Sequence, residues 1–427
     1  MRQENKRMSA ARTNSSKWMA PEIAHVMYQR ALAVGILFGA VSLGLALFPA
    51  TRAQFFRSYL LGFMFWLGIT LGSMAFLMIQ HLTGGMWGMV IRRPLEAAIK
   101  VLPLMLILFA PVVVGIPHLY SGDSHSHGWF NAIQSDGHLW ELSQAYLRRG
   151  GTVQFLFLNG FIGRGVVYFA IWLWMAWTLI RWSNEQDAPP VQNLSPRFRR
   201  MAAPGLILYA FTISFAAIDW VMSLDPRWFS TIFGFIIIVG ECLSAMCLMV
   251  ILETILSREE PLSLWLKPKE VHDHGKLMLT FIMLHAYFSF SQLLIIWAGN
   301  LPMEIRFYLR RLEHGWGYVG LFLVLFHFSV PFALLLSRPL KRNPYRLVKL
   351  AGWLLFARFV DLFWYIQPTW QESFTWGWGY LVDIIVPVAI GGLWLAYFFH
   401  HLRQRPLLPA YDMHAREFLD YAGVAHD

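Results

Sequence analysis

The chain has 427 residues, of which 57% are hydrophobic and only 14% are charged. A soluble protein of this length needs a much more polar surface, so the composition indicates an integral membrane protein. The net charge of +10 does not indicate nucleic-acid binding, because the basic residues lie in short connections between apolar segments.

The chain begins with a polar, basic segment, residues 1–30, which lacks an apolar core followed by a cleavage site. We predict that it is a cytoplasmic segment and not a cleaved signal peptide. About 20 apolar residues are needed to cross about 30 Å of hydrocarbon as a helix. Ten stretches meet this requirement: 31–48, 58–80, 95–116, 152–180, 203–222, 229–256, 276–298, 315–337, 346–366 and 376–400. The sequence therefore predicts an all-α transmembrane domain over 31–400, followed by a cytoplasmic C-terminal tail over 401–427.

The orientation is predicted from lysine and arginine in the connections. The N-terminus and every second connection after it, including Arg92 and Arg93, carry most of these residues. Cytoplasmic connections are enriched in Lys and Arg, so this set is expected inside. An even number of spans then places both termini on the cytoplasmic side of the membrane.

The longest outer connection, 117–151, contains His125 and His127 in a polar stretch. A His-x-His pair is a candidate metal site, but two imidazoles without a third ligand are weak evidence. The alternative is a polar surface loop that contacts a partner.

The chain has only two cysteines, Cys242 and Cys247, and both lie in the sixth stretch. Two thiols cannot hold an iron–sulfur cluster or a structural zinc site.

Several ionisable residues fall inside the predicted spans, where a charge is costly and usually faces the interior of the helix bundle. By rise per residue, one group is expected near mid-membrane and a second in its outer part. These candidates for a proton pathway are Arg164, Glu241, His285, His327 and Arg358 in the first group, and Asp219, Asp361 and Asp383 in the second. The alternative is that each such residue serves only to fix helix register through a buried pair.

Helical spacing groups these residues further. Arg358 and Asp361 are neighbours at i and i+3 and are expected to pair on their own helix. His285, Ser289 and Gln292 form a polar seam at i, i+4 and i+7. His285 and His327 are also candidate axial ligands of a haem b. The alternative is that each is a hydrogen-bonded core residue, which is the more common role of a single histidine inside a span.

Two longer motifs carry a resemblance. The first is Ala217-Ile218-Asp219-Trp220-Val221-Met222-Ser223-Leu224-Asp225-Pro226-Arg227-Trp228-Phe229-Ser230-Thr231; the second runs from His272-Asp273-His274-Gly275-Lys276 to Gly299-Asn300-Leu301-Pro302 and Glu304. The first motif predicts that the fifth span ends at Asp219 and Trp220 and that a turn follows. The second predicts a helix that starts near Asp273 and stops at Gly299-Asn300-Leu301-Pro302.

Both motifs resemble the ActF subunit family of bacterial alternative complex III, a quinol:electron-acceptor oxidoreductase, within the wider NrfD/polysulfide-reductase membrane family. The resemblance implies two four-helix bundles with flanking helices. It implies partners, namely a related ten-helix subunit, an iron–sulfur subunit and haem c subunits, whose clusters and haems carry the redox chemistry. It further implies that this chain binds no cofactor alone, and that it supports quinol oxidation and a candidate proton pathway. The residues of a quinone pocket are not assigned by the resemblance.

Two other functions stay open at the level of sequence. A secondary transporter or ion channel would also place ionisable groups inside the membrane, often on helices broken near the midplane; Pro331 and Pro387 could each kink a span. A purely structural membrane anchor of a respiratory complex would use the buried charges only as internal pairs.

Overall fold

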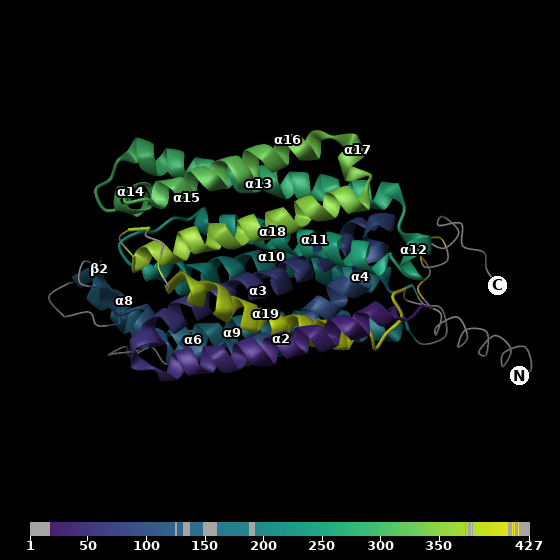
Figure 1. Cartoon of the computed structure of the whole chain (residues 1–427), viewed down its shortest axis with the longest axis horizontal. Coiled ribbons are helices and arrows are strands. Elements are labelled where there is room, and N and C mark those ends of the chain that lie inside the picture. Colours follow the sequence, from purple (N-terminus) through teal and green to yellow (C-terminus); the bar gives the residue numbers. More distant parts are fainter. Residues whose placement is uncertain are drawn as a thin grey trace, which may run out of the picture.

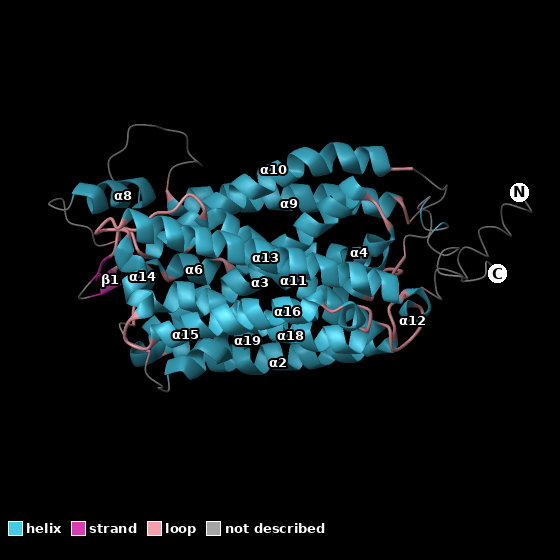
Figure 2. Cartoon of the chain, turned by 90° about the horizontal axis from the view of Figure 1, so that it is seen from above, coloured by secondary structure: helices cyan, strands magenta, loops and turns pink. Residues whose placement is uncertain are grey.

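The computed structural model describes residues 18–123, 126–130, 137–147, 160–187, 193–371, 373–374, 377, 379–408, 412, 414 and 417. Long helices lie side by side along one direction (Figure 1). The view turned by 90° shows the same elongated array, with the short elements gathered at its two ends (Figure 2). Within the described residues, nine helical segments are long and apolar enough to cross a membrane. This confirms an all-α, multi-pass membrane protein.

Six of these segments are single helices, and three combine shorter elements. The single ones are α2 (Glu22–Leu47), α3 (Pro49–Thr83), α9 (Phe161–Glu185), α11 (Phe233–Leu256), α13 (Pro268–Gly299) and α19 (Gly379–Leu402). The composite ones are α4 (Met86–Ile99) with α5 (Leu102–Leu108) and α6 (Ala110–Val114), α10 (Ser195–Trp220) with the 3-10 turn η1 (Met222–Leu224), and α15 (Trp316–Phe322) with the π-helix η2 (Leu323–Ser329) and α16 (Val330–Leu336).

The tenth predicted stretch, 346–366, forms helix α18 (Pro344–Ile366) but is not among the nine apolar segments. It has 23 residues, enough to cross a bilayer. Its charged residues Arg346, Lys349, Arg358 and Asp361 are spread along its length, so it has no long uncharged stretch. In the array it lies among the long helices, beside α11 and α13 (Figure 1). The described chain thus has nine apolar segments where the sequence predicts ten, and a charged helix at the tenth position.

Short elements connect the long helices at both ends of the array. They are α7 (Ile116–Leu119), the antiparallel pair β1 (Gly122–Asp123) and β2 (Ser126–His127), α8 (Gly137–Leu147), the 3-10 turn η1 (Met222–Leu224), α12 (Leu262–Trp265), α14 (Ile305–Leu312), α17 (Arg338–Lys341) and the 3-10 turn η3 (Gln367–Thr369). His125, one half of the predicted His-x-His pair, lies outside the described residues.

Helix α3 lies at the centre of the packing, because almost all of its most apolar stretch is buried. Its main neighbours are α11, α19, α10 and α4. Glycines let these neighbours approach closely. A Cβ built on Gly72 would lie 2.3 Å from the carbonyl oxygen of Glu241, and one on Gly62 would lie 2.8 Å from Cα of Pro387. Small residues at such contacts are typical of membrane helices, since lipid supplies no hydrophobic drive for helix association.

The ends of the described chain meet at one end of the array. The backbone of Met19 pairs with that of Pro406, and the Leu407 amide donates to the Trp18 carbonyl at 2.7 Å. Helices α14 and α8 lie at the opposite end (Figure 1). The described chain therefore begins and ends on the same side of the array, as the sequence predicts for the termini.

Helix boundaries follow the sequence signals at several positions. Helix α10 ends at Trp220 and α13 ends at Gly299, where Asn300 adopts the left-handed conformation common after a helix. Helix α13 begins at Pro268, earlier than the predicted start near Asp273, because a proline is well accommodated in the first helical turn.

One predicted connection is wrong. Arg92 and Arg93 were placed in a cytoplasmic loop, but both are buried within α4. Arg92 contacts Glu96 and Asp412, while Arg93 contacts Glu96 and Asp187. Glu96 lies on the same helix, but Asp187 and Asp412 come from distant parts of the chain, so local sequence did not show that the arginines would be buried.

Candidate functional site

The central cluster joins His285 on α13 to Arg358 and Asp361 on α18. His285 Nε2 lies 3.2 Å from Asp361 Oδ2 and 3.4 Å from Arg358 Nη1. Arg358 also forms an ion pair with Asp361, one helical turn further on. The predicted i, i+3 pair is thus confirmed, and a histidine from a second helix joins it. All three side chains are buried.

His327 reaches this cluster from the π-helix η2. Its ring lies edge-on to that of His285, with 4.9 Å between the centroids. Pro331 follows four residues later, and a proline ring clashes with the carbonyl of residue i−4 in an α-helix. Widening the turn relieves that clash, and the Val330 amide donates to the Leu325 carbonyl five residues back. Such π-turns are frequent at functional sites.

Glu241 approaches the cluster from α11. The Tyr209 hydroxyl donates to its carboxylate at 3.0 Å. Glu241, Ser244 and Arg358 line one small cavity of about 10 Å³, roughly the space of a single water. Gly240 allows the approach, since a Cβ there would lie 2.2 Å from Cζ of Arg358. Glu241, Arg358, Asp361, His285 and His327 therefore form one continuous series from α11 through α18 to α13 and η2.

A larger cavity of about 510 Å³ opens on the other side of this series. His285, His327 and Asp361 line it, together with residues of α13, α14, α15, η2 and α18. The series thus runs from a site for one water at Glu241 to a space of small-ligand size.

The donor set at the histidines fits metal and haem poorly. One ligand atom each from His285, His327 and Asp361 lies within 4.8 Å of the others, as a metal centre would require. However, the Arg358 guanidinium already contacts both Asp361 and His285, so its positive charge opposes a cation at the same place. The two imidazoles touch edge to face, which leaves no space for a porphyrin between them.

Arg164 and Asp219 form a separate group, together with Tyr168. The Arg164 guanidinium donates to both carboxylate oxygens of Asp219, at 2.7 and 3.0 Å, and the Tyr168 hydroxyl donates at 2.8 Å. These three donors come from α9, and none of them belongs to the central cluster. This group has the geometry of a buried pair that fixes α9 against α10, which is the structural alternative considered for the sequence.

Asp383 forms a third group, between α19 and α3. Neutral donors surround its Oδ1 atom: Ser58 at 2.5 Å, Gln367 at 2.6 Å and Gln54 at 3.1 Å. The eight predicted candidates therefore divide into a connected set of five and two local groups. Apart from the Arg358–Asp361 pair, the sequence could not assign these residues to neighbours.

Sequence reasoning missed a buried pair between α11 and α13. Nδ1 of His274 lies 2.8 Å from Glu253, and Nε2 of the same ring lies 2.9 Å from the carbonyl oxygen of Trp87. Both ionisable side chains are fully buried. Glu253 was visible in the sequence as an ionisable residue near one end of a span, but no local pattern linked it to His274.

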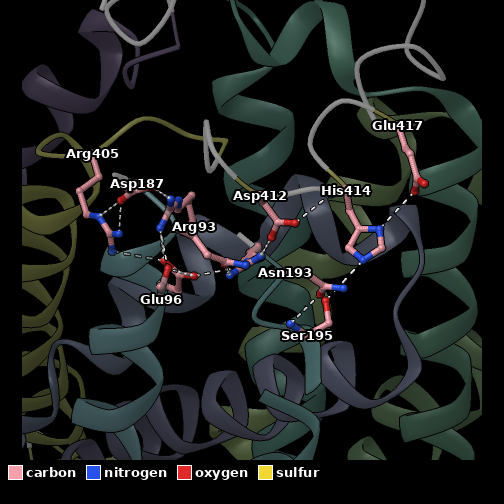
Figure 3. A network of polar contacts seen from close by, with 12 residues as sticks. Arg93, Glu96, Asp187, Asn193, Ser195, Arg405, Asp412, His414 and Glu417 are labelled. Atoms are coloured by element: carbon pink, nitrogen blue, oxygen red, sulfur yellow. Dashed lines mark hydrogen bonds and ion pairs between the residues drawn. The ribbon is translucent and has the colours of Figure 1, made fainter. Parts of the chain in front are cut away.

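A second missed feature is a charge network at the end of the array where the described chain begins and ends (Figure 3). Glu96 is surrounded by three guanidiniums, those of Arg92, Arg93 and Arg405. Arg405 also pairs with Asp187, and Arg92 pairs with Asp412. The network ties the segment after α19 to α4 and to the end of α9.

The fold and the buried series define a class: a polytopic α-helical membrane protein with a polar array inside its helix bundle. No protein-family model and no curated protein matches the chain.

Proposed function

We propose that the chain is an integral membrane subunit of a quinol:electron-acceptor oxidoreductase similar to alternative complex III. In this proposal it supports quinol oxidation and carries a proton pathway through the bundle. The observation that carries the pathway is the continuous series from Glu241 through Arg358 and Asp361 to His285 and His327.

The chemistry of the series suits proton transfer. From Asp361 onwards a carboxylate and two imidazoles follow one another within contact distance, and a water-sized space separates Glu241 from Arg358. A proton can pass along groups that each accept and release it, provided that water or a side chain bridges every gap. A guanidinium is a donor only, so in this proposal Arg358 sets the electrostatic balance of the series, and water in the small cavity carries the proton past it, from Glu241 towards Asp361.

The proposal extends to the assembly. The ten helices are assigned to two four-helix bundles with flanking helices, in the bacterial inner membrane with both termini cytoplasmic. A related ten-helix subunit, an iron–sulfur subunit and haem c subunits are the proposed partners. These partners supply the redox centres, which agrees with a chain that has only two cysteines, both buried in α11.

The test begins with the native complex, purified in mild detergent from membranes and assayed for haem c, iron–sulfur clusters and quinol oxidation. Single substitutions Glu241→Gln, His285→Leu and Asp361→Asn are expected to lower turnover and proton uptake. Thr280→Ala is the matched control on α13, because its hydroxyl is exposed and bonds only to its own helix, at the Lys276 carbonyl. Unchanged turnover and proton uptake in all three variants would show that the series is no pathway. Absence of redox cofactors from the purified complex would refute the assignment to an oxidoreductase.

A structural anchor is the second candidate, and the Arg164–Asp219 group favours it. Under that function every buried charge serves packing alone. The double variant Arg358→Leu/Asp361→Leu would then retain full turnover, whereas the pathway proposal expects that variant to lose it.

A further inference from the structure

A cluster of basic and aromatic side chains lies where α2 begins and α19 ends. Arg403, directly after α19, is half-buried, and its guanidinium lies over the Tyr28 ring, 4.2 Å from the ring centroid. Nη1 of Arg403 contacts Nδ1 of His25 at 2.7 Å, and Nη2 contacts Nδ1 of His400 at 3.4 Å. We call these four residues the α2–α19 cluster.

The charge of this cluster is not neutralised within the described chain. A guanidinium has only donors, so both imidazoles accept with Nδ1 and are neutral in this arrangement. Arg405, two residues further on, pairs with two carboxylates, whereas the polar contacts of Arg403 are the two rings. Glu22, one helical turn before His25, is exposed and forms no ion pair with the cluster in the described part of the chain. The cluster therefore keeps a positive charge that can attract an anion from outside.

The cluster lies at the level expected for lipid headgroups. It is at one end of two membrane-spanning segments that pack along each other, and tyrosine is typical of the boundary between lipid and water. Further along α2, side chains such as Ile36 and Leu37 are apolar and mostly exposed. In a membrane these side chains meet acyl chains. A molecule with both a phosphate and acyl chains can therefore contact the cluster and α2 together.

We propose that the α2–α19 cluster binds the phosphate of an anionic phospholipid, such as phosphatidylglycerol, from the leaflet at this end of the molecule. The guanidinium donors that the imidazoles do not engage contact the phosphate oxygens, and the acyl chains follow α2. Basic sites between membrane helices on the cytoplasmic side are a known type of site for anionic headgroups. The inference is independent of the proposed redox function.

Two simpler molecules share part of this chemistry. Inorganic phosphate offers the same anion but has no acyl chains, and phosphatidylcholine has the chains but no net charge. The α2–α19 cluster is therefore expected to prefer phosphatidylglycerol to both.

The test measures lipid binding to the full chain in detergent micelles by native mass spectrometry, with each phospholipid titrated separately. Phosphatidylglycerol is expected to bind more tightly than phosphatidylcholine by about fivefold or more, the effect of one basic side chain at a membrane surface. Arg403→Gln removes the cation, and Gln404→Glu places a carboxylate beside it at an exposed position. Each is expected to weaken the binding of phosphatidylglycerol by about fivefold. Because Gln404 is exposed, its variant keeps the test valid even if Arg403→Gln fails to fold.

Arg199→Gln is the matched control, because Arg199 is exposed on α10 and its loss lowers the net charge by the same single unit. It is expected to leave the binding of phosphatidylglycerol unchanged. Unchanged binding in both Arg403→Gln and Gln404→Glu would overturn the proposal, and so would equal weakening by Arg199→Gln. Phosphatidylcholine that binds as tightly as phosphatidylglycerol would overturn it as well. Displacement of phosphatidylglycerol by inorganic phosphate would show that the site takes the free anion and not a lipid.

Discussion

At the scale of single residues, Arg358 and Asp361 are two buried side chains of opposite charge that stabilise each other as an ion pair. Both side chains are at most 4% exposed. Removing one member of a buried pair leaves the other without compensation, whereas replacing both by apolar residues is often neutral. The pair is therefore a place where stability and function can be separated by experiment.

We expect Asp361→Asn and Arg358→Leu each to destabilise the fold by about 3–5 kcal/mol. The double variant Arg358→Leu/Asp361→Leu should recover most of that loss, because no isolated charge remains. Steric trapping in bicelles measures the free energy of unfolding. If the double variant were as unstable as the sum of the single ones, the two residues would act independently and not as a pair.

At the scale of elements, close contact between α3 and α11 depends on glycine. A Cβ on Gly72 would lie 2.3 Å from a backbone oxygen of α11, which cannot rotate away. The two helices would have to separate, and their separation would also move Glu241, whose own carbonyl is the contacted group.

Gly72→Ala is accordingly expected to destabilise the protein by about 1–3 kcal/mol, the usual cost of overpacking. Gly39→Ala on α2 is the control, since nothing lies within 4 Å of a Cβ there. Alanine favours helix over glycine, so the control should be neutral or slightly stabilising. Equal unfolding free energies for the two variants would show that α3 and α11 tolerate separation.

The π-helix η2 is the second element whose local chemistry matters. Pro331→Ala removes the ring that clashes with the carbonyl of His327 and restores an amide donor. We expect an ordinary α-helix to form there, which would rotate His327 away from His285. An α-helical backbone at 323–329 in a new structure of this variant would confirm the expectation.

Pro344→Ala serves as the control for that change, because Pro344 occupies the first turn of α18, where proline is tolerated. Its backbone at 323–329 should match that of the unmodified chain. Persistence of the π-turn in Pro331→Ala would show that packing between α13 and α18 shapes η2, and not the proline.

At the scale of the whole molecule, the array has two distinct ends. The described chain begins and ends at one of them, held by the Met19–Pro406 pairing and the Glu96 network (Figure 3). Helix α14 and the short strands lie at the other (Figure 1). The two natural cysteines are buried, so introduced thiols report on each end without interference.

Single cysteines at exposed Glu22 and Gln404 are expected to react with a membrane-impermeant thiol reagent only from the cytoplasmic side. A cysteine at exposed Glu313, beyond α14, should react only from the opposite side. The excess of Lys and Arg in the connections on the first side is the physical reason. Reaction of Glu22→Cys and Glu313→Cys from the same side would contradict the topology, and reversed sidedness would contradict the orientation.

The sequence by itself determined the class of this protein and the course of its helices. Long apolar stretches can only be helices in lipid, so their order and most of their approximate ends were readable, as was the i, i+3 pairing of Arg358 with Asp361. Proline and glycine signals located the ends of α10 and α13.

Only the tertiary structure decided which charges meet. His285, His327 and Asp361 lie on three different helical segments, and Glu253 and His274 pair between two others. Contacts between helices depend on their rotation and tilt, which arise from packing over the whole bundle and leave no local periodic signal. For the same reason, burial of Arg92 and Arg93 and the cavity beside His327 could be seen only after the helices were assembled.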